Sequence, residues 1–436
     1  MRTRVLEIPD LLIVALGVFL YGLFSQWGER GSLTGPMVFT AFGLVTGAAM
    51  LDVVRLSVQG GFMHGLAEIT LVLVLFTDAA RIDVSRLGAQ HDVPLRLLGI
   101  GLPLTMVAGT AAAMVLFPDL GIWPAAILGV ILSPTDAALG QAVVSNPVIP
   151  VRVRQALNVE SGLNDGLAFP ILLIVLSLAA EEEATRGVAS WAFFVAAQIA
   201  LGPLAGVVIG AVGSACVEWA VRRGDMNRVF VQISVLCLAV LAFGTAEVIG
   251  GNGFIAAFVA GMVVGTRSRT LLDAVEDFGE TEGQLLNLVV FLIFGAVLLP
   301  TALGHLTAAH VLYAALSLTV IRMVPVAISL IGTRLVPVTV LFIGWFGPRG
   351  LASILYVLII SEGYPALPGL GDIVTVAYLT VLMSILAHGV SASPLARRYG
   401  RRIGAMEGAD AEQVTVAPFP TRLRHRERRG DGEPIA

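Results

Sequence analysis

Long apolar runs separated by short polar segments follow one another from Pro9 to Ala396. Apolar runs of roughly 17 residues or more are long enough to cross the hydrocarbon core of a bilayer as helices. We therefore expect an all-α polytopic membrane protein with about thirteen transmembrane helices. The spans are expected at about residues 9–26, 35–52, 65–80, 93–117, 121–142, 153–180, 188–220, 228–248, 252–267, 283–300, 307–332, 336–361 and 371–396.

Two of these spans are interrupted by polar or helix-breaking residues. Residues 133–136 read Ser-Pro-Thr-Asp in the fifth span, and residues 347–350 read Gly-Pro-Arg-Gly in the twelfth. A proline in a helix interior removes a backbone hydrogen bond and clashes with the preceding turn. Each interruption lies about twelve residues into its span, which is roughly 18 Å along a helix and near the middle of the bilayer. Two broken helices that cross at the midplane are typical of the substrate site of a transporter.

The positions of the arginines predict the topology. With the N-terminus outside and the C-terminus in the cytoplasm, the inside loops carry 16 arginines and the outside segments carry four. This asymmetry agrees with the positive-inside rule for a multi-pass protein of the cell (inner) membrane. Spans 4–6 and spans 11–13 then run in opposite directions, and each triplet has its broken helix in the middle. We therefore expect two inverted repeats.

Composition supports a membrane protein and excludes other classes. Of the 436 residues, 56% are hydrophobic and only 13% are charged, whereas soluble domains carry about 25% charged residues. The net charge of −4 gives no indication of a nucleic-acid partner. Cys216 and Cys237 both lie in apolar runs, so we expect neither a disulfide nor a thiolate metal site, and no cofactor. All 27 cationic residues are arginine, which excludes a mechanism based on a titrating lysine.

The two ends of the chain differ in character. The first apolar run has neither the short apolar core nor the small-residue cleavage site of a signal peptide, so we expect it to be retained as a span. Residues 404–436 are rich in arginine and poor in large apolar residues. We therefore expect a transmembrane domain over residues 1–403, followed by a disordered cytoplasmic tail.

Five ionisable side chains fall in the central parts of spans: Asp136, Glu160, Asp165, Arg322 and Arg349. Charges at such depths are costly and usually functional. Ion pairs of Glu160 with Arg322, or else with Arg349, and of Asp136 with Arg349 would offset the cost of burial. With three carboxylates and two arginines, Asp165 is the carboxylate that these pairs do not use. Alternatively, Asp136 is placed to neutralise the positive helix end at the interruptions and Arg349 the negative one.

Asp165 has polar neighbours on its own side of the sixth span. Glu160 and Asn164 are four residues apart, and so are Ser161 and Asp165. Desolvation raises the pKa of a buried carboxylate, which is then neutralised either by a proton or by a monovalent cation. For Na⁺ we expect oxygen ligands from Asp165, from the Ser161 hydroxyl and from the carbonyl freed at Thr135. Because the two occupants exclude one another, the site predicts exchange of one H⁺ per cation with no net charge moved.

Four segments resemble the electroneutral branch of the cation:proton antiporter superfamily, which includes prokaryotic Na⁺/H⁺ antiporters and the animal sodium/proton exchangers. They read SPTDAA from residue 133, NVESGLNDG from 158, GNGFIAAFVAG from 251 and GPRGL from 347. The resemblance extends over about residues 10–396. The electrogenic branch typically has two adjacent aspartates and a titrating lysine, so Asn164 and the absence of lysine both favour electroneutral exchange.

The resemblance implies a homodimer with two domains in each protomer. A core domain would comprise about residues 93–180 and 307–396, and a dimer or scaffold domain about residues 9–80 and 188–300. The core would move against the scaffold in an elevator-like step. A role in pH homeostasis and sodium transport would follow from such an exchange.

The resemblance also implies roles for individual residues. Asp165 would bind the ion with Asn164 as its helper, and Ser161 and Thr135 would be ligands. Glu160 would pair with an arginine. The remaining acid of the fifth span, Asp136, would lie where the broken helices cross.

Several alternatives remain open at this point. A K⁺/H⁺ antiporter would use the same residues, whereas a Na⁺-coupled symporter for an organic solute would need a roomier midplane cavity. An intramembrane enzyme would need a catalytic pair, and we expect no enzyme because His388 is more simply packed or hydrogen-bonded. Asp78, near the end of the third span, is a weaker candidate for the ion path, since some relatives have a glutamate in that region.

Overall fold

The chain folds as a bundle of long helices in the computed structural model, which describes residues 8–30, 33–53, 61–82, 92–183, 188–304, 306–406 and 409–414. Within these residues no strand is present. The helices of the first half are α1 (Ile8–Arg30), α2 (Gly35–Thr46), α3 (Gly61–Ala80), α5 (Asp92–Arg96), α6 (Leu102–Leu116), α7 (Ile122–Ile131), α8 (Ala137–Val144), α9 (Val151–Glu183) and α10 (Val188–Arg222). Those of the second half are α11 (Arg228–Val248), α12 (Gly253–Arg267), α13 (Arg269–Phe278), α14 (Gln284–Ile293), α15 (Leu299–Leu303), α16 (Ala308–Leu318), α17 (Val320–Ser329), α18 (Pro337–Trp345), α19 (Leu351–Gly363), α20 (Leu370–Gly404) and α21 (Asp410–Gln413).

The helices confirm the membrane fold expected from the apolar runs. Seven of them are long and apolar enough to cross a bilayer, and five shorter apolar helices of 10–17 residues lie among them within the described chain. The tenth span is longer than predicted, because a helical run extends from Arg269 to Leu303 through π-helical turns. Its first part, α13, is strongly amphipathic, so an apolar-run criterion misses it.

Both predicted interruptions are breaks between separate helices. The fifth span is divided into α7 and α8 by residues 132–136, and the twelfth into α18 and α19 by residues 346–350. Each broken helix is the middle member of a triplet, between α6 and α9 in one case and between α16–α17 and α20 in the other.

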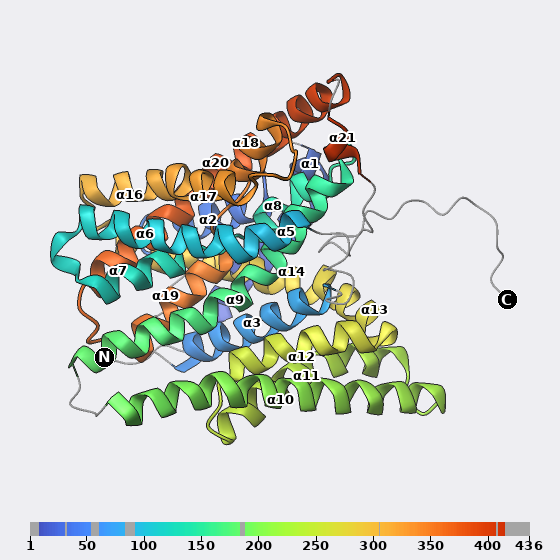
Figure 1. The fold of residues 1–436 in the computed structure, drawn as a ribbon. Helices are drawn as coiled ribbons and strands as arrows, with labels where there is room; N and C mark the ends of the chain where they lie inside the picture. Colours follow the sequence, from blue (N-terminus) through green and yellow to red (C-terminus); the bar gives the residue numbers. More distant parts are fainter. Residues whose placement is uncertain are drawn as a thin grey trace.

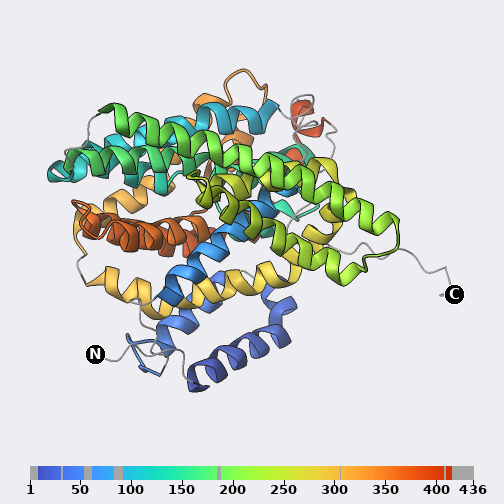
Figure 2. The same cartoon turned by 90° about the horizontal axis from the view of Figure 1, so that it is seen from below.

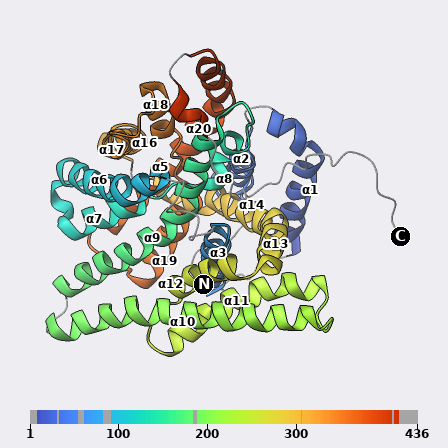
Figure 3. The same cartoon turned by 45° about the vertical axis from the view of Figure 1, so that its right-hand side comes forward.

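The two triplets pack against each other, and α9, α19 and α20 also contact the remaining helices. Figure 1 shows α16, α17 and α6 along one side of the molecule and α10, α11 and α12 along the other, with α9 and α3 between them. Helix α17 packs on α6, α20 on α7 and α8, and α7 on α9. In the view from below, α1 lies at the edge of the bundle (Figure 2), and the rotated view places α2 and α14 between α1 and the triplets (Figure 3).

Glycines allow α10 to lie directly against α12. A Cβ on Gly206 would lie 2.5 Å from the carbonyl oxygen of Ala256, and a Cβ on Gly202 or Gly210 would be nearly as close to the α12 segment. Small residues at four-residue spacing are a common means of close packing between membrane helices. Helices α10 and α12 therefore form one unit that depends on the missing side chains.

A short C-terminal segment is folded where the sequence predicts disorder. Residues 409–414 include α21, and Glu412 is fully buried and accepts a hydrogen bond from the Val336 amide at 2.8 Å. The side chain of Arg152 donates to the carbonyl of Ala411. The expectation of a disordered tail from residue 404 is therefore wrong for residues 409–414. Specific polar contacts hold this segment in place, and no long apolar run marks it in the sequence. Residues 415–436 lie outside the described chain.

Substitution of Gly206 by alanine is expected to destabilise the protein. The added methyl group collides with the α12 backbone, and overpacking of this kind typically costs about 1–3 kcal/mol. Gly244→Ala in α11 is the matched control, because a Cβ there meets no atom within 4 Å. Thermal unfolding of the purified variants in detergent should show a lower transition temperature for Gly206→Ala alone. Equal transition temperatures would contradict the packing described here.

Candidate ion-binding site at the crossing of the broken helices

The two breaks contact each other directly through their backbones. The amide of Asp136 donates to the carbonyl of Pro348 at 2.7 Å. The hydroxyl of Ser353, in the first turn of α19, donates to the carbonyl of Ile131 at the end of α7 at 2.9 Å. The interrupted segments therefore cross, and each supplies hydrogen-bond partners that the other lost when its helix was broken.

Asp136 serves the N-termini of two helices at once. One carboxylate oxygen accepts from the amides of Ala138 and Leu139 at 2.6 and 3.3 Å, and so caps α8. The other oxygen accepts from the amide of Leu351 at 2.7 Å, at the start of α19. A carboxylate is favourable at the positive end of a helix, and this one neutralises two such ends. The close fit requires Gly350, where a Cβ would lie 2.1 Å from the carboxylate.

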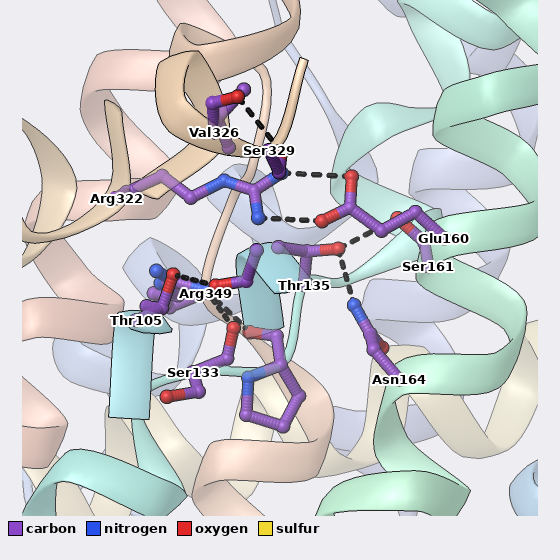
Figure 4. A network of polar contacts seen from close by, with 12 residues as sticks. Thr105, Ser133, Thr135, Glu160, Ser161, Asn164, Arg322, Val326, Ser329 and Arg349 are labelled. Carbon is purple, nitrogen blue, oxygen red and sulfur yellow. Dashed lines mark hydrogen bonds and ion pairs between the residues drawn. The ribbon is translucent and has the colours of Figure 1, made fainter. Parts of the chain in front are cut away.

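Arg349 serves a helix C-terminus instead of an acid. Its guanidinium group donates to the carbonyl of Ser133 and, at 2.9 Å, to that of Pro134, just beyond the end of α7 (Figure 4). The side chain is completely buried. Asp136 and Arg349, which both belong to the described chain, do not form the ion pair that the charge count suggested. The alternative expectation holds, because each neutralises the partial charge of a helix end.

Glu160 and Arg322 form a buried, two-pronged ion pair. Both terminal nitrogens of the Arg322 guanidinium group donate to the Glu160 carboxylate, one of them at 2.8 Å (Figure 4). The side chain of Glu160 is only 2% exposed and that of Arg322 only 1%. The pair joins α9 to α17. Of the two arginines considered as partners of Glu160, the observed one is therefore Arg322, the first choice. Arg322 also lies against the second break, where a Cβ on Gly347 would be 2.4 Å from its Nε atom.

Three polar side chains form a cluster between the first break and α9. The hydroxyls of Thr135 and Ser161 are 2.9 Å apart, and the Asn164 amide donates to the Thr135 hydroxyl at 2.7 Å (Figure 4). All three side chains are buried. The Oδ1 atom of Asn164 is buried and has no hydrogen-bond donor among the described residues. An oxygen in this situation is suited to a cation or a water molecule.

Asp165 lies next to this cluster on α9, and it is 6% exposed. It follows Asn164 directly and is one helical turn beyond Ser161. Its backbone carbonyl accepts a hydrogen bond from the Tyr356 hydroxyl at 2.8 Å, which fixes α9 against α19. The next residue, Gly166, lies so close to Phe258 of α12 that a Cβ would be 2.0 Å from the ring. The acid is therefore at the boundary between the triplets and the helices around α12.

Asp78 lies on α3, apart from the crossing. It is 5% exposed, and its carboxylate forms an ion pair at 3.7 Å with Arg81, the first residue after the end of α3. Its carbonyl oxygen faces α9, since a Cβ on Gly162 would lie 3.6 Å from it. Asp78 is thus a neighbour of the α9 face that carries Ser161 and Asp165.

Sequence reasoning missed the support that α20 gives to the second break. The Ser384 hydroxyl accepts from the Arg349 amide at 2.7 Å. His388, one turn later, lies 2.8 Å from the carbonyl of Trp345 at the end of α18 and 3.1 Å from Ser384. His388 is hydrogen-bonded as expected, but it is part of the crossing. The available signal was the spacing of Ser384 and His388 four residues apart in an apolar helix.

Comparison with known proteins gives a consistent set of relatives. Residues 12–398 match the family model described as the sodium/hydrogen exchanger, transmembrane. The chain is 30% identical over 362 residues to the Na⁺/H⁺ antiporter NhaP of Pseudomonas aeruginosa, covering 78% of this chain and 82% of that protein. It is 26% identical over 415 residues to the K⁺/H⁺ antiporter NhaP of Alkalimonas amylolytica, covering 93% and 70%.

A solved structure has the same fold. The sodium proton antiporter MjNhaP1 from Methanocaldococcus jannaschii superimposes with a TM-score of 0.72 at 19% sequence identity, over 90% of this chain and 98% of that one. This likeness concerns the arrangement of the helices and confirms the all-α membrane architecture.

Removal of one partner of the Glu160–Arg322 pair is expected to destabilise the protein strongly. Glu160→Gln or Arg322→Gln leaves the other charge buried, which typically costs about 3–5 kcal/mol. The double variant Glu160→Leu/Arg322→Met removes both charges and should lose less than either single variant. Chemical or thermal unfolding of the purified proteins measures these differences.

The matched control is Asp225→Asn, which breaks the pair between Arg223 and Asp225, whose side chains are both 60% exposed. An exposed pair of this kind contributes only about 0–1 kcal/mol. If either single substitution at the buried pair cost no more than the control, the buried ion pair would not have the structural role assigned to it.

Proposed function

Since this chain belongs to the sodium/hydrogen exchanger family, we propose that it exchanges Na⁺ for H⁺ by competition at the carboxylate of Asp165. The coarser statement, that it is a multi-pass membrane cation/proton antiporter and not an enzyme, follows from the family and from relatives named as antiporters. The single observation that carries the proposal is the group of oxygens beside the first break. Thr135, Ser161 and Asn164 are buried and hydrogen-bonded to one another there, and Asp165, the next residue on α9, is also buried.

These oxygens suit a hard monovalent cation. In the proposed site, Asp165 supplies the negative charge, and Ser161 and the carbonyl of Thr135 supply neutral oxygen ligands. Asn164 holds Thr135 through its amide nitrogen and directs an unsatisfied oxygen into the same region. Glu160 is not a ligand in this proposal, because Arg322 occupies both of its oxygens.

The exchange follows from charge balance. With a proton bound, Asp165 is neutral, and with Na⁺ bound, the site is again neutral. One cation therefore replaces one proton, and the loaded site crosses the membrane without net charge in either direction. This is an electroneutral cycle in which the two arginines of the crossing keep the same charge throughout.

Alternating access is proposed to arise from movement of one group of helices against another. Residues 93–180 and 307–396 would form the moving core and residues 9–80 and 188–300 the scaffold of a homodimer. The position of Asp165 at the boundary with α12 supports this division. We also propose the inner cell membrane, an external N-terminus and a cytoplasmic C-terminus, in line with the arginine distribution, and a role in pH homeostasis.

K⁺/H⁺ exchange is the second candidate, because the relatives include proteins named for either ion. The same acid would serve both ions. A sodium-coupled solute symporter has lost its support, since the relatives are named as antiporters.

Asp165→Asn is expected to abolish exchange while the protein still folds, because asparagine has the same shape but cannot alternate between a proton and a cation. The measurement is the internal pH of proteoliposomes with an imposed pH gradient, after addition of Na⁺, K⁺ or Li⁺. Asp225→Asn, which removes a 60% exposed aspartate in a loop, is the matched control and should exchange normally.

The same assay tests the ion and the charge balance. Na⁺ should dissipate the gradient, and clamping the membrane potential should change the rate little. Cation-dependent exchange that persists in Asp165→Asn would contradict the proposed site. A preference for K⁺ over Na⁺ would select the second candidate.

A further inference from the structure

A groove with an apolar floor lies on the outside of the second broken helix, between α17, α18 and α20. It has a volume of about 330 Å³, at the lower end of the range of roughly 300–1,000 Å³ that is usual for sites of small ligands. It is a separate feature from the ion site, because its lining includes none of Thr135, Ser161, Asn164 and Asp165. Its lining includes Met323, Leu341, Trp345, Leu395, Arg398 and Arg402.

Packed aromatic rings form the floor of this groove. Phe342 stacks on Tyr399 with ring centroids 4.0 Å apart, and Phe346 lies 4.6 Å from Phe342. The indole of Trp345 is held by a hydrogen bond to the Ser391 hydroxyl at 3.0 Å. The floor of the groove is therefore held in place by these contacts and is mostly apolar. Leu341, at its outer edge, is 58% exposed on α18, one half of the second broken helix, so the groove opens toward lipid.

Two arginines stand at one end of the groove. Arg398 and Arg402 are four residues apart near the C-terminal end of α20, so they project from the same face of the helix. Both are exposed, and neither forms an ion pair with any described residue. By contrast, Arg152 at the same end of the bundle is paired with Asp92 at 2.8 Å. Among the described residues, the two groove arginines therefore have no carboxylate that competes with an anion.

We infer that this groove binds one anionic glycerophospholipid. The phosphate lies between Arg398 and Arg402, and an acyl chain lies along Trp345 and Leu341. Charge complementarity selects an anionic head group, and the apolar floor requires a hydrocarbon tail joined to it. A free phosphate ion would use the arginines and leave the groove empty. Basic side chains at the end of membrane helices are a usual means of recognising anionic lipid.

The location gives the lipid a structural consequence. Its chain contacts α18, which is one half of the broken helix, and its head group is held by α20, which supports the break through Ser384 and His388. The bound lipid therefore joins two of the elements that fix the crossing. This role is independent of which cation the protein exchanges.

The test is lipid retention by the purified full-length protein. The protein is placed in nanodiscs of phosphatidylcholine with a minor fraction of phosphatidylglycerol, extracted in mild detergent and examined by native mass spectrometry. The wild type should retain phosphatidylglycerol in preference to phosphatidylcholine. In Arg398→Gln/Arg402→Gln this preference should fall on the order of tenfold, which corresponds to about 1.4 kcal/mol for the two arginines together.

The matched control is Arg397→Gln/Arg401→Gln. It removes the same charge from exposed positions one residue earlier on the same helix, outside the groove. The control should keep the preference of the wild type. Equal loss in both double variants would show general attraction of anionic lipid to a basic helix end and would overturn the inference. A wild type with no preference for phosphatidylglycerol, or full displacement of the lipid by inorganic phosphate, would also overturn the inference.

A spectroscopic arm locates the acyl chain. Brominated phosphatidylglycerol should quench the fluorescence component that is lost in Trp345→Phe more than brominated phosphatidylcholine does at the same mole fraction. Arg398→Gln/Arg402→Gln should remove that difference. Equal quenching of Trp345 by the two lipids in the wild type would place the chain elsewhere and overturn the site.

Discussion

Broken helices inside a membrane protein bring together helix ends whose partial charges have no bulk water to solvate them. Here Asp136 accepts hydrogen bonds from the starts of α8 and α19, and Arg349 donates to the carbonyls that follow α7. The crossing of the two breaks depends on this neutralisation. Both side chains are hydrogen-bonded to backbone groups at helix ends. This explains why Asp136 and Arg349 do not pair with each other although they carry opposite charges. The small volume of Gly350 is part of the same arrangement, since it allows the Asp136 carboxylate to reach the Leu351 amide.

The buried charged side chains have different roles. Arg322 is held by Glu160 and links α9 to α17, so both arginines of the crossing have structural partners. On this account the carboxylate that changes its occupant is Asp165, beside the oxygens of Ser161, Asn164 and Thr135. The proposed lipid groove involves the second broken helix as well, because it is lined by residues of α17, α18 and α20.

Much of this arrangement is encoded locally. Apolar runs predict the spans, the proline-containing segments predict the breaks, and the five central charges predict where the site lies, because each depends on residues close in sequence. The actual partners of Asp136 and Arg349, which are backbone groups at helix ends, could not be predicted in the same way. Whether a charge meets another charge or a helix end depends on the relative position of two segments more than 200 residues apart. The part played by Ser384 and His388, and the anchoring of residues 409–414, depend on tertiary contacts for the same reason.

The most direct test of the central claim is the number of protons released when Na⁺ binds. Calorimetric titration of the purified protein with Na⁺ in buffers of different ionisation enthalpy gives this number without any transport step. If one cation displaces one proton at Asp165, release should approach one proton per Na⁺ where the acid is protonated, and it should decline as the pH rises. Asp165→Asn should bind no Na⁺. Binding without proton release at any pH, or unchanged binding in Asp165→Asn, would contradict the account.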